Sequence, residues 1–279
     1  MKRSAPRPAL STNRRTLRAA IALAAVIAAL LPALASAAEP VVSVWYRGNP
    51  AGTPRQSDLG AIRALGFNGV TWPRASAAGM AELMRLAGLV GLKVVIADGA
   101  PLPIDGRSAF RPPNRVDIAV AAATPGMISA LAWRAVAHGA RVIAFDAGAR
   151  TGAGLEEPDG ALKPWARAAI NVSRQLTANA NLANEMRPGP GLILTPAPPP
   201  TLDVVLLDAD RSWVIVATNT SGSPVSSRVR LPAGTPYALW VSWLEGSPLA
   251  MISEPAGPRW MLRMEPRSAL VYIIDKQMK

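Results

Sequence analysis

The sequence predicts an α/β fold with a parallel sheet, followed by an antiparallel β-sandwich, and three observations support this prediction. A unit made of an amphipathic helix, a glycine and a buried strand occurs three times between residues 57 and 146. Such repetition is typical of parallel strands that are joined by helices. From Leu202 onward the hydrophobic periodicity changes to 2, as in strands with one covered face. The proline-rich stretch Thr195–Pro200 separates the two patterns and reads as a stiff connection.

The first two units have the same order of features. Each begins with a helix whose apolar residues recur at helical spacing. Gly66 and Gly91 end the two helices, and the strands Phe67–Trp72 and Leu92–Ala97 follow, the second leading into Asp98. The apolar positions of the two helices are Leu59, Ile62 and Leu65, and Met80, Leu83, Met84, Ala87 and Val90.

The third unit, Thr124–Gly148, is the most complete. His138 stands in the last helical turn, where a cation is favoured, and Gly139 follows at the position of a left-handed cap residue. Val142–Phe145 is a continuous apolar run that predicts a strand covered on both faces, and it ends in Asp146. The apolar helix face consists of Met127, Ile128, Leu131, Ala132 and Ala135. A carboxylate at the end of such a strand lies where open α/β sheets and (β/α) barrels place their chemistry.

The remaining elements of the α/β part are less regular. Val41–Arg47 predicts a first strand, and Ser57 or Asp58 is expected to cap the first helix. Gly99–Arg115 has four prolines and no sustained periodicity, which predicts a long loop. Val116–Val120 predicts another strand.

The C-terminal part predicts six strands of a sandwich. A last long helix is expected over Pro164–Met186, and we place domain boundaries at 38–191 for the α/β part, 192–201 for a Pro-rich linker and 202–279 for the sandwich. The predicted strands are Asp203–Asp208, Ser212–Asn219, Val225–Leu231, Tyr237–Leu244, Arg259–Met264 and Ala269–Ile274.

Residues 1–37 have the pattern of a secretory signal peptide. A basic start is followed by the uncharged stretch Ala19–Ala35 and by small residues suited to cleavage after Ala37, or alternatively after Ala35. Arg14-Arg15 resembles the pair of a twin-arginine signal, which would imply export of a folded protein. We therefore expect a secreted or periplasmic protein. An uncleaved membrane anchor is the alternative, although the stretch is short and contains Pro32.

Composition excludes several classes of function. Six of the 30 basic residues and none of the 18 acidic ones precede the cleavage site, so the mature chain keeps 24 basic residues and a net charge of +6. These charges are dispersed and accompany no nucleic-acid-binding motif, so we expect no nucleic-acid partner and, after cleavage, no membrane partner. The absence of cysteine excludes disulfides and cysteine–zinc sites, and the single histidine excludes a multi-histidine metal site. We expect no cofactor.

Two segments resemble a known family of enzymes. Pro125–Ala140 is similar to the seventh helix and eighth strand of the β-galactosidase-like glycoside hydrolases of family 42 and their relatives, and Ser57–Val70 resembles the start of the same barrel. This resemblance implies a (β/α) barrel followed by a small β-sandwich, hydrolysis of O-glycosyl bonds, and a carbohydrate ligand. Such enzymes use two glutamates, one after the fourth and one after the seventh barrel strand.

The departures from this family predict an incomplete TIM-like (β/α) barrel. A complete barrel has eight parallel strands and needs about 200–250 residues. In this sequence only about five parallel strands fit between Val41 and Val142. No Asn-Glu pair stands at a strand end in Gly99–Arg115, where strands four to six would be compressed. The glutamate pair therefore cannot be carried over to this sequence.

Asp98 and Asp146 are the candidate catalytic residues because both end predicted strands. Two carboxyl groups about 5–5.5 Å apart suit a retaining glycosidase, and about 6.5–9.5 Å an inverting one. Asp146 would serve as nucleophile or base and Asp98 as the acid. The alternative is that both aspartates cap a helix or a turn. Glu156 and Glu157 are expected on a solvated loop at the same rim.

Aromatic and basic residues near two strand ends are candidates for substrate binding. Trp45, Tyr46 and Trp72 could stack on sugar rings, and Arg47 and Arg74 could bind the carboxylate of an acidic sugar in bidentate fashion. Alternatively, the aromatic side chains belong to the core.

Other aromatic and imidazole side chains are expected to be structural. His138 suits a helix-end role better than that of a general base, because helix ends lie far from the carboxyl ends of the strands. Trp133 is expected to pack between helices. The tryptophans of the second part are expected in the sandwich core, with a carbohydrate-binding face as the alternative; they are Trp213, Trp240, Trp243 and Trp260.

Two main hypotheses about function follow. The first is an exported glycoside hydrolase-like protein that acts on or binds a carbohydrate. The second is a non-catalytic carbohydrate-binding or structural protein on a degenerate glycosidase scaffold. A third is a homodimer in which two partial barrels cover each other's open sheet edges.

Overall fold

The structure is a computed structural model that describes residues 40–49, 51–73, 77–97, 115–120, 123–235, 241–245 and 257–276. The chain divides into Met1–Ala38 and the compact unit Glu39–Lys279. The predicted signal peptide, Arg74, Asp98 and nearly all of the predicted loop Gly99–Arg115 lie outside the described residues. Within the described residues, no helix is long and apolar enough to cross a lipid bilayer.

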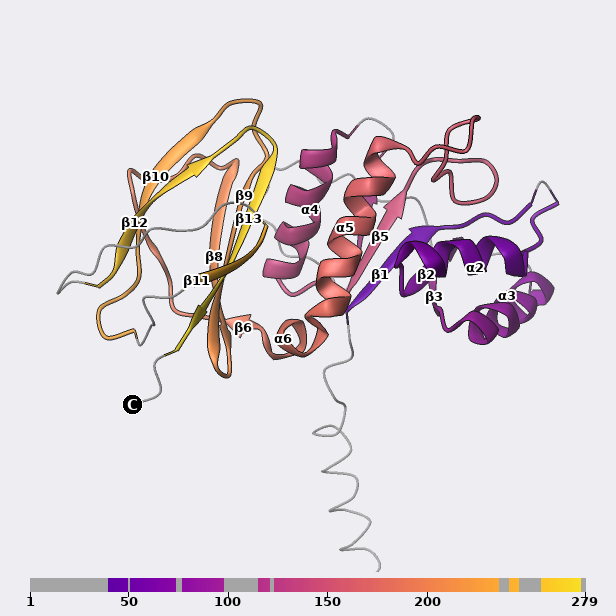
Figure 1. Cartoon of the computed structure of the whole chain (residues 1–279), viewed down its shortest axis with the longest axis horizontal. Coiled ribbons are helices and arrows are strands. Elements are labelled where there is room, and N and C mark those ends of the chain that lie inside the picture. The colour runs from indigo at the N-terminus through magenta and orange to yellow at the C-terminus, as the bar shows by residue number, and fades with distance from the viewer. Residues whose placement is uncertain are drawn as a thin grey trace, which may run out of the picture. The chain divides into compact units, whose positions relative to one another are not determined.

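A five-stranded parallel sheet forms one layer of the compact unit (Figure 1). The sheet order is β3-β2-β1-β5-β4, so the first strand is central and pairs with both β2 and β5. All four pairings are parallel, which confirms the predicted α/β class and the expected number of parallel strands. The strands are β1 (Val41–Trp45), β2 (Gly69–Pro73), β3 (Lys93–Ala97), β4 (Arg115–Ala119) and β5 (Val142–Asp146).

The helices cover one face of this sheet. Alternate strand residues such as Val44 and Phe145 share a core with helix residues such as Leu59, Ile128 and Val172. Because strand side chains alternate between the two faces of a sheet, only every second strand residue packs against the helices and needs to be apolar. The helices are α2 (Gln56–Leu65), α3 (Ala77–Val90), α4 (Pro125–Ala137), α5 (Pro164–Ala178) and α6 (Ala180–Glu185).

Two helix predictions were wrong at the ends. Ser57 and Asp58 do not cap α2, because Arg55 is the N-cap residue and no side chain caps it; Asp58 lies inside the first turn, where its carboxylate accepts a hydrogen bond from the hydroxyl of Tyr46. The long helix expected over Pro164–Met186 is interrupted at Asn179, whose side chain donates to the carbonyl of Gln175 and separates α5 from α6.

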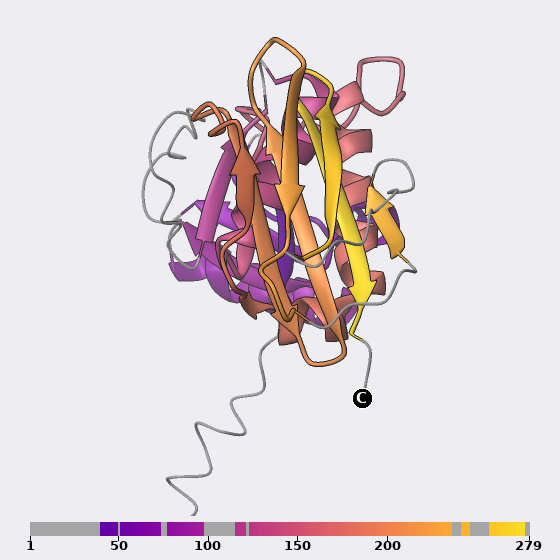
Figure 2. The ribbon, with the colours of Figure 1, turned by 90° about the vertical axis from the view of Figure 1, so that its left-hand side faces the viewer.

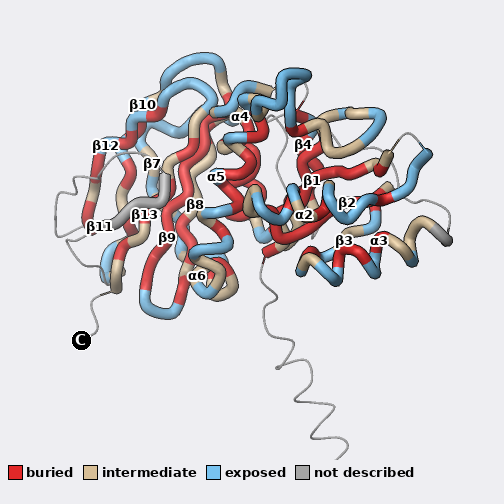
Figure 3. Tube along the Cα trace, turned by 45° about the vertical axis from the view of Figure 1, so that its right-hand side comes forward, coloured by how far each residue is buried: buried red, intermediate tan, exposed pale blue. Residues whose placement is uncertain are grey.

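The helix α4 ends as predicted, and a side chain caps its start. The hydroxyl of Thr124 accepts from the backbone N–H of Met127, Pro125 occupies the first turn, and Gly139 follows the helix with φ +90°. Every residue from Ala130 to Ala137 is buried. A helix that is buried all round must be covered on two sides, and the second cover is the C-terminal sandwich (Figures 1 and 3).

The sandwich consists of two antiparallel sheets that the sequence largely predicted (Figure 2). One sheet has the order β11-β13-β9-β8-β6 and the other β12-β10-β7. The strands are β6 (Arg187–Pro188), β7 (Ile193–Thr195), β8 (Leu202–Ala209), β9 (Ser212–Asn219), β10 (Val225–Arg230), β11 (Val241–Glu245), β12 (Arg259–Met264) and β13 (Ser268–Asp275). Trp213 and Trp260 lie in the sandwich core as expected; Trp240 and the side chain of Trp243 lie outside the described part.

The central strand β9 joins the two cores of the compact unit. All eight of its residues are buried. Val214 and Val216 belong to the core that contains α4, whereas Trp213 and Ile215 belong to the core between the two sandwich sheets. The α/β layer and the sandwich therefore share one continuous body of apolar side chains. The segment expected as a linker contains β7, which pairs with β10.

The parallel sheet is an incomplete barrel. Its edge strands β3 and β4 have no backbone pairing with each other, yet the side chain of Arg115 on β4 donates from Nη1 to the carbonyl of Ile96 on β3 at 2.9 Å. A side chain can link the two edges only if the sheet curls. The face without helices is therefore the inside of this curl, and we call it the inner face.

Candidate functional site

The inner face carries polar side chains where a complete barrel would be filled by packed residues. Residues 43, 45 and 47 of the first strand and its extension alternate with the core residues Val42, Val44 and Tyr46, so they lie on this face. Ser43 and Thr71 share a hydrogen bond of 2.7 Å between their hydroxyls. Both are fully buried, so the inner face is closed to water at this level.

Asp146 lies at the carboxyl end of β5, where the sequence predicted a functional carboxylate. Its two oxygens accept from Nη1 and Nη2 of Arg47, each at 2.9 Å, in bidentate geometry. The backbone N–H of Gly148 also donates to Oδ1 at 2.8 Å. Asp146 is 5% exposed. Asp146 thus has the predicted turn-forming role, and it also forms an ion pair with Arg47, which the sequence had not predicted.

A second carboxylate on the inner face, Asp117, was not among the predicted site residues. Its Oδ1 accepts from the indole N–H of Trp45 at 3.1 Å, and its Oδ2 is 3.0 Å from Nε and 2.9 Å from Nη2 of Arg115. Arg115 and Asp117 are two residues apart on β4 and therefore face the same side. The spacing of two residues could have shown from the sequence that Arg115 and Asp117 are neighbours on one face. Asp117 was nevertheless not predicted as a site residue, because it lies within a predicted strand and the candidates were sought at strand ends.

Trp45 connects the two arginine–carboxylate pairs. The guanidinium carbon of Arg47 lies 5.0 Å from the centroid of its ring, within the range of a cation–π interaction. The polar contacts run in sequence from Asp146 through Arg47 and Trp45 to Asp117 and Arg115. This connected set, which we call the inner-face network, links β5, β1, β4 and, through Ile96, β3.

Tyr46 and Trp72 lie on the opposite face of the sheet from Trp45. Their rings are 5.5 Å apart in the core beneath the helices, and the two residues are 0% and 1% exposed. Neither ring is available to stack on a sugar, because the alternation of strand side chains directs both into the helix layer. Burial, together with the hydrogen bond to Asp58, raises the pKa of the Tyr46 hydroxyl well above its usual value of 10.0.

The loop that follows β5 contributes to a small hollow on the outside of the barrel. Glu156 and Glu157 are exposed on this loop, as predicted. Glu156, Asp58 and Tyr46 line a hollow of about 280 Å³ against α2. This hollow was not predicted, because its two carboxylates are separated by almost a hundred positions in the sequence.

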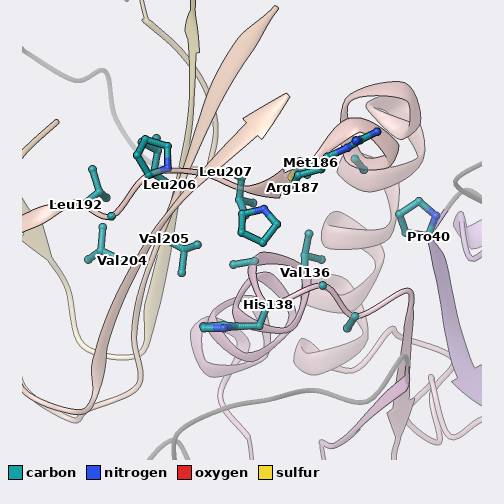
Figure 4. Close-up of a pocket in the computed structure, with 18 of the residues that line it drawn as sticks. Pro40, Val136, His138, Met186, Arg187, Leu192, Val204, Val205, Leu206 and Leu207 are labelled. Atoms are coloured by element: carbon teal, nitrogen blue, oxygen red, sulfur yellow. The ribbon is translucent and has the colours of Figure 1, made fainter. Parts of the chain in front are cut away.

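A larger hollow of about 320 Å³ lies at the opposite end of the sheet (Figure 4). It is lined by the end of α4, by the segment around Met186 and by β8. His138 lines it, and its Nε2 lies 2.6 Å from a carboxylate oxygen of Asp203 on β8. His138 therefore attaches the helix end to the sandwich. In parallel α/β sheets chemistry lies at the carboxyl ends of the strands, so this hollow is the weaker candidate for a reaction site.

In the described part of the chain, no three His, Asp or Glu side chains are grouped so that they could hold a metal ion. The predicted pairing of Asp146 with Asp98, and the predicted contribution of Arg74, involve positions outside the described residues.

No protein-family model matches the chain, and a search of curated proteins finds no match. Among solved structures, the chain is similar to a glycoside hydrolase family 30 subfamily 8 xylanase from Clostridium acetobutylicum, with 13% identity and a TM-score of 0.37 over 78% of this chain and 59% of that one. It is also similar to an α-amylase from Geobacillus thermoleovorans (10% identity, TM-score 0.40, 84% of this chain and 60% of that chain). A third similar structure is a putative α-N-acetylgalactosaminidase from Bacillus halodurans (9% identity, TM-score 0.40, 80% and 62%).

These three solved structures are named as glycoside-hydrolysing enzymes, and the chain spans about three fifths of the length of each. At these TM-scores the similarity carries no argument about substrate or activity.

Proposed function

We propose that the protein is an exported, glycosidase-like protein that binds carbohydrate without hydrolysing it. The observation that carries this proposal is the bidentate contact of Arg47 with Asp146. It occupies the carboxylate at the strand end where a barrel enzyme would keep a free reactive group.

The chemistry of glycoside hydrolysis explains why this contact matters. A retaining enzyme needs a carboxylate oxygen that attacks the sugar, and an inverting enzyme needs one that takes a proton from water. Both oxygens of Asp146 accept charge-assisted hydrogen bonds, and one also accepts from Gly148. Attack by Asp146 would remove the negative charge of the carboxylate and thereby weaken these contacts in a nearly dry environment, where such bonds are strong.

The same contact supports binding of an acidic sugar. The Arg47 side chain is held in one orientation by Asp146 and by the Trp45 ring, and it remains 23% exposed beside the strand ends. A guanidinium has five N–H donors, so those that do not bind Asp146 can donate hydrogen bonds to a sugar carboxylate. An ordered arginine loses less conformational entropy on binding than a free one. The resemblance of Pro125–Ala140 to glycoside hydrolases of family 42 is consistent with a carbohydrate ligand.

The alternative is a hydrolase in which Asp146 acts as nucleophile or base and Asp98 as the acid. A screen of the purified protein against chromogenic aryl glycosides, combined with a glycan array, separates the two proposals. We expect binding to glycans that contain uronic acids and no turnover. Turnover that Asp146→Asn abolishes, with an unchanged circular dichroism spectrum, would establish the hydrolase instead.

A matched pair of variants tests the role of Arg47 in binding. Arg47→Lys keeps the charge but loses the planar fork, so we expect it to weaken binding of the acidic glycan about tenfold. Arg228→Lys on the sandwich strand β10 serves as the control and should leave binding unchanged. Equal binding by both variants would exclude Arg47 from the site.

Export is the second part of the proposal and rests on the signal-like residues 1–37. Expression in a bacterial host followed by fractionation and N-terminal sequencing should give a periplasmic or secreted protein that begins at Ala38. A chain that retains Met1 in the membrane fraction would support the anchor instead.

A further inference from the structure

The hollow beside the end of α4 lies where the chain leaves the edge of the sandwich after β6 (Figure 4). β6 pairs with β8 over only two residues, and the N–H of Gly189 adds one further bond, to the carbonyl of Leu206. The chain then crosses to the other sheet, where Ile193 begins β7 and pairs with β10. The edge of β8 from Leu202 to Val205 therefore has no strand beside it in the described part of the chain.

The backbone of Val204 is directed to this open edge. Along an antiparallel strand, successive residues direct their N–H and C=O groups to opposite sides. The carbonyl of Leu206 points toward β6, because it accepts from Gly189. Val204 lies two positions earlier and therefore points the same way. Since β6 does not reach this position, neither backbone group of Val204 has a partner among the described residues.

The open edge faces the hollow. The side chain of Val204 packs against the core between the two sandwich sheets, so the part of Val204 that lines the hollow is its backbone. Other walls are apolar and include Val136 of α4 and Met186, which precedes β6. The volume of about 320 Å³ lies near the lower end of the range for small-ligand pockets, roughly 300–1,000 Å³. The hollow therefore has room for a short segment and not for a long strand.

An extended peptide has the chemistry that this edge requires. Bonding through both the N–H and the C=O of one residue is the pattern of a strand that is added to a sheet. The peptide residue opposite Val204 would face the sandwich side, which Leu192 already fills. Its two neighbours would face α4, as Val205 does. The hollow thus favours a small residue between two apolar ones.

We propose that the open edge of β8 and the hollow beside it bind an extended peptide segment of about three residues by adding it as a strand. The central residue exchanges both of its backbone hydrogen bonds with Val204. The flanking apolar side chains lie against Val136 and Met186. The site is at the opposite end of the parallel sheet from Arg47 and does not depend on the carbohydrate proposal.

Nuclear magnetic resonance of the isotope-labelled protein with the capped peptide acetyl-valyl-alanyl-valyl-amide tests the proposal. The valines flank the alanine in either strand direction, and the caps remove the terminal charges. We expect a saturable shift of the Val204 amide signal and slower hydrogen exchange at that amide, because its N–H becomes bonded.

A peptide that is methylated on the alanine nitrogen lacks the donor for the Val204 carbonyl. We expect it to bind about fivefold more weakly. Equal binding of the two peptides, or no saturation by roughly 10 mM of the unmethylated one, would overturn the proposal.

Strand β12 provides a control within the same spectrum. It is also the edge of its sheet in the described part of the chain, but it does not line the hollow. Its amide signals should not shift with the peptide. Equal shifts on β8 and β12 would mean that the peptide pairs with any open edge, and the hollow would then have no part in binding.

A matched pair of variants tests the wall of the hollow. Val205→Thr keeps the branched shape of a lining residue but replaces a methyl group by a hydroxyl, so it should weaken peptide binding severalfold. Val225→Thr makes the same change at another half-buried position, on β10, and should leave binding unchanged. Equal losses in the two variants would contradict the proposed site.

Sedimentation of the protein without peptide tests the other occupant of an open edge, a second copy of this chain. We expect a monomer whose Val204 amide exchanges freely. A dimer in which this amide is already protected would show that the edge serves self-association, and would overturn the peptide site.

Discussion

The two faces of the parallel sheet are built on opposite principles. On β1, Val42 and Val44 pack beneath the helices, whereas Ser43 and Trp45 face the inside of the curl. The helix face is held by apolar contacts that have no preferred direction. The inner face is held by directed contacts between charged and polar groups. One strand thus serves two layers whose stability depends on different properties of the side chains.

The difference between the two faces explains why this incomplete barrel can have a polar interior. Three of the five strands contribute to the inner-face network, and the remaining edge is reached by Arg115 through the carbonyl of Ile96. A polar group in a dry interior is tolerated only when its hydrogen bonds are made. The network meets this condition for Asp117 and Asp146, so the two carboxylates act as connections between strands.

The largest expected effect comes from the helix face. Trp72→Ala removes a ring that is 1% exposed and leaves a cavity beneath the helices. We expect a loss of about 3–5 kcal/mol in the free energy of unfolding, measured by urea denaturation. Met84→Ala on α3, where the side chain is 57% exposed, is the control and should change stability by less than about 0.5 kcal/mol. A small effect of Trp72→Ala would mean that the helix layer is loosely packed.

The next largest effect distinguishes the two faces on a single strand. Asp117→Asn changes no volume but removes the charge that two arginine nitrogens and Trp45 share, so we expect a loss of about 2–3 kcal/mol. Its neighbour Ile118 points into the opposite core, and Ile118→Val should cost about 1 kcal/mol. The comparison is measured by urea denaturation of both variants. If the polar substitution were the cheaper one, the inner face would not depend on charge.

Much of this fold could be predicted because the helix face follows simple periodicity. The spacing of Leu59 and Ile62, the glycines that end α2 and α4, and the apolar run of β5 each gave an element close to its observed place. The inner face could not be predicted in the same way. Arg47 and Asp146 are 99 positions apart, and no local pattern relates them.

The short strands and the packing of the sandwich against α4 were also not predicted. β6 and β7 have two and three residues, too few for a period of 2 to show against proline and glycine neighbours. The all-round apolar character of α4 was the one local sign that the sandwich would cover it. All three predicted binding aromatics are buried: Trp45 packs with Ala97 and Ala144 on the inner face, whereas Tyr46 and Trp72 lie in the core beneath the helices. A shift of one position along a strand moves a side chain to the other face of the sheet. The presence of aromatic residues near a strand end therefore does not tell which of them lie on which face.

A smaller effect concerns the alkaline side of the stability profile. Tyr46 is a phenol whose pKa is raised above 10.0, first by burial and then by its bond to Asp58. The folded state therefore holds the proton more tightly than the unfolded chain does. This contribution is complete below about pH 10 and is lost as the pH rises further. Tyr46→Phe should cost about 1 kcal/mol at pH 7 through the lost hydrogen bonds, and should flatten the decline in unfolding temperature between about pH 9.5 and 11.

Tyr272 provides a second test of this alkaline profile, at a buried tyrosine elsewhere in the structure. Its pKa is also raised by burial, so Tyr272→Phe should flatten the decline as well, but without loss of a bond to Asp58. A steeper alkaline decline in Tyr46→Phe than in the unchanged protein would contradict the burial of its hydroxyl.

The smallest expected effect is that of an exposed arginine–carboxylate pair, which we compare with the buried pair of the inner face; both pairs are bidentate. Arg85 binds Glu82 on α3 through Nε and Nη2 at 2.8 and 2.7 Å, as closely as Arg47 binds Asp146. The α3 pair lies in solvent, where water and salt compete with it. Glu82→Gln should leave the unfolding midpoint unchanged within error, whereas Asp146→Asn should lower it, and added salt should not remove that difference. Because the two pairs are both bidentate and similar in length but differ in burial, equal midpoints for the two variants would show that the surroundings of the inner face do not strengthen its contacts.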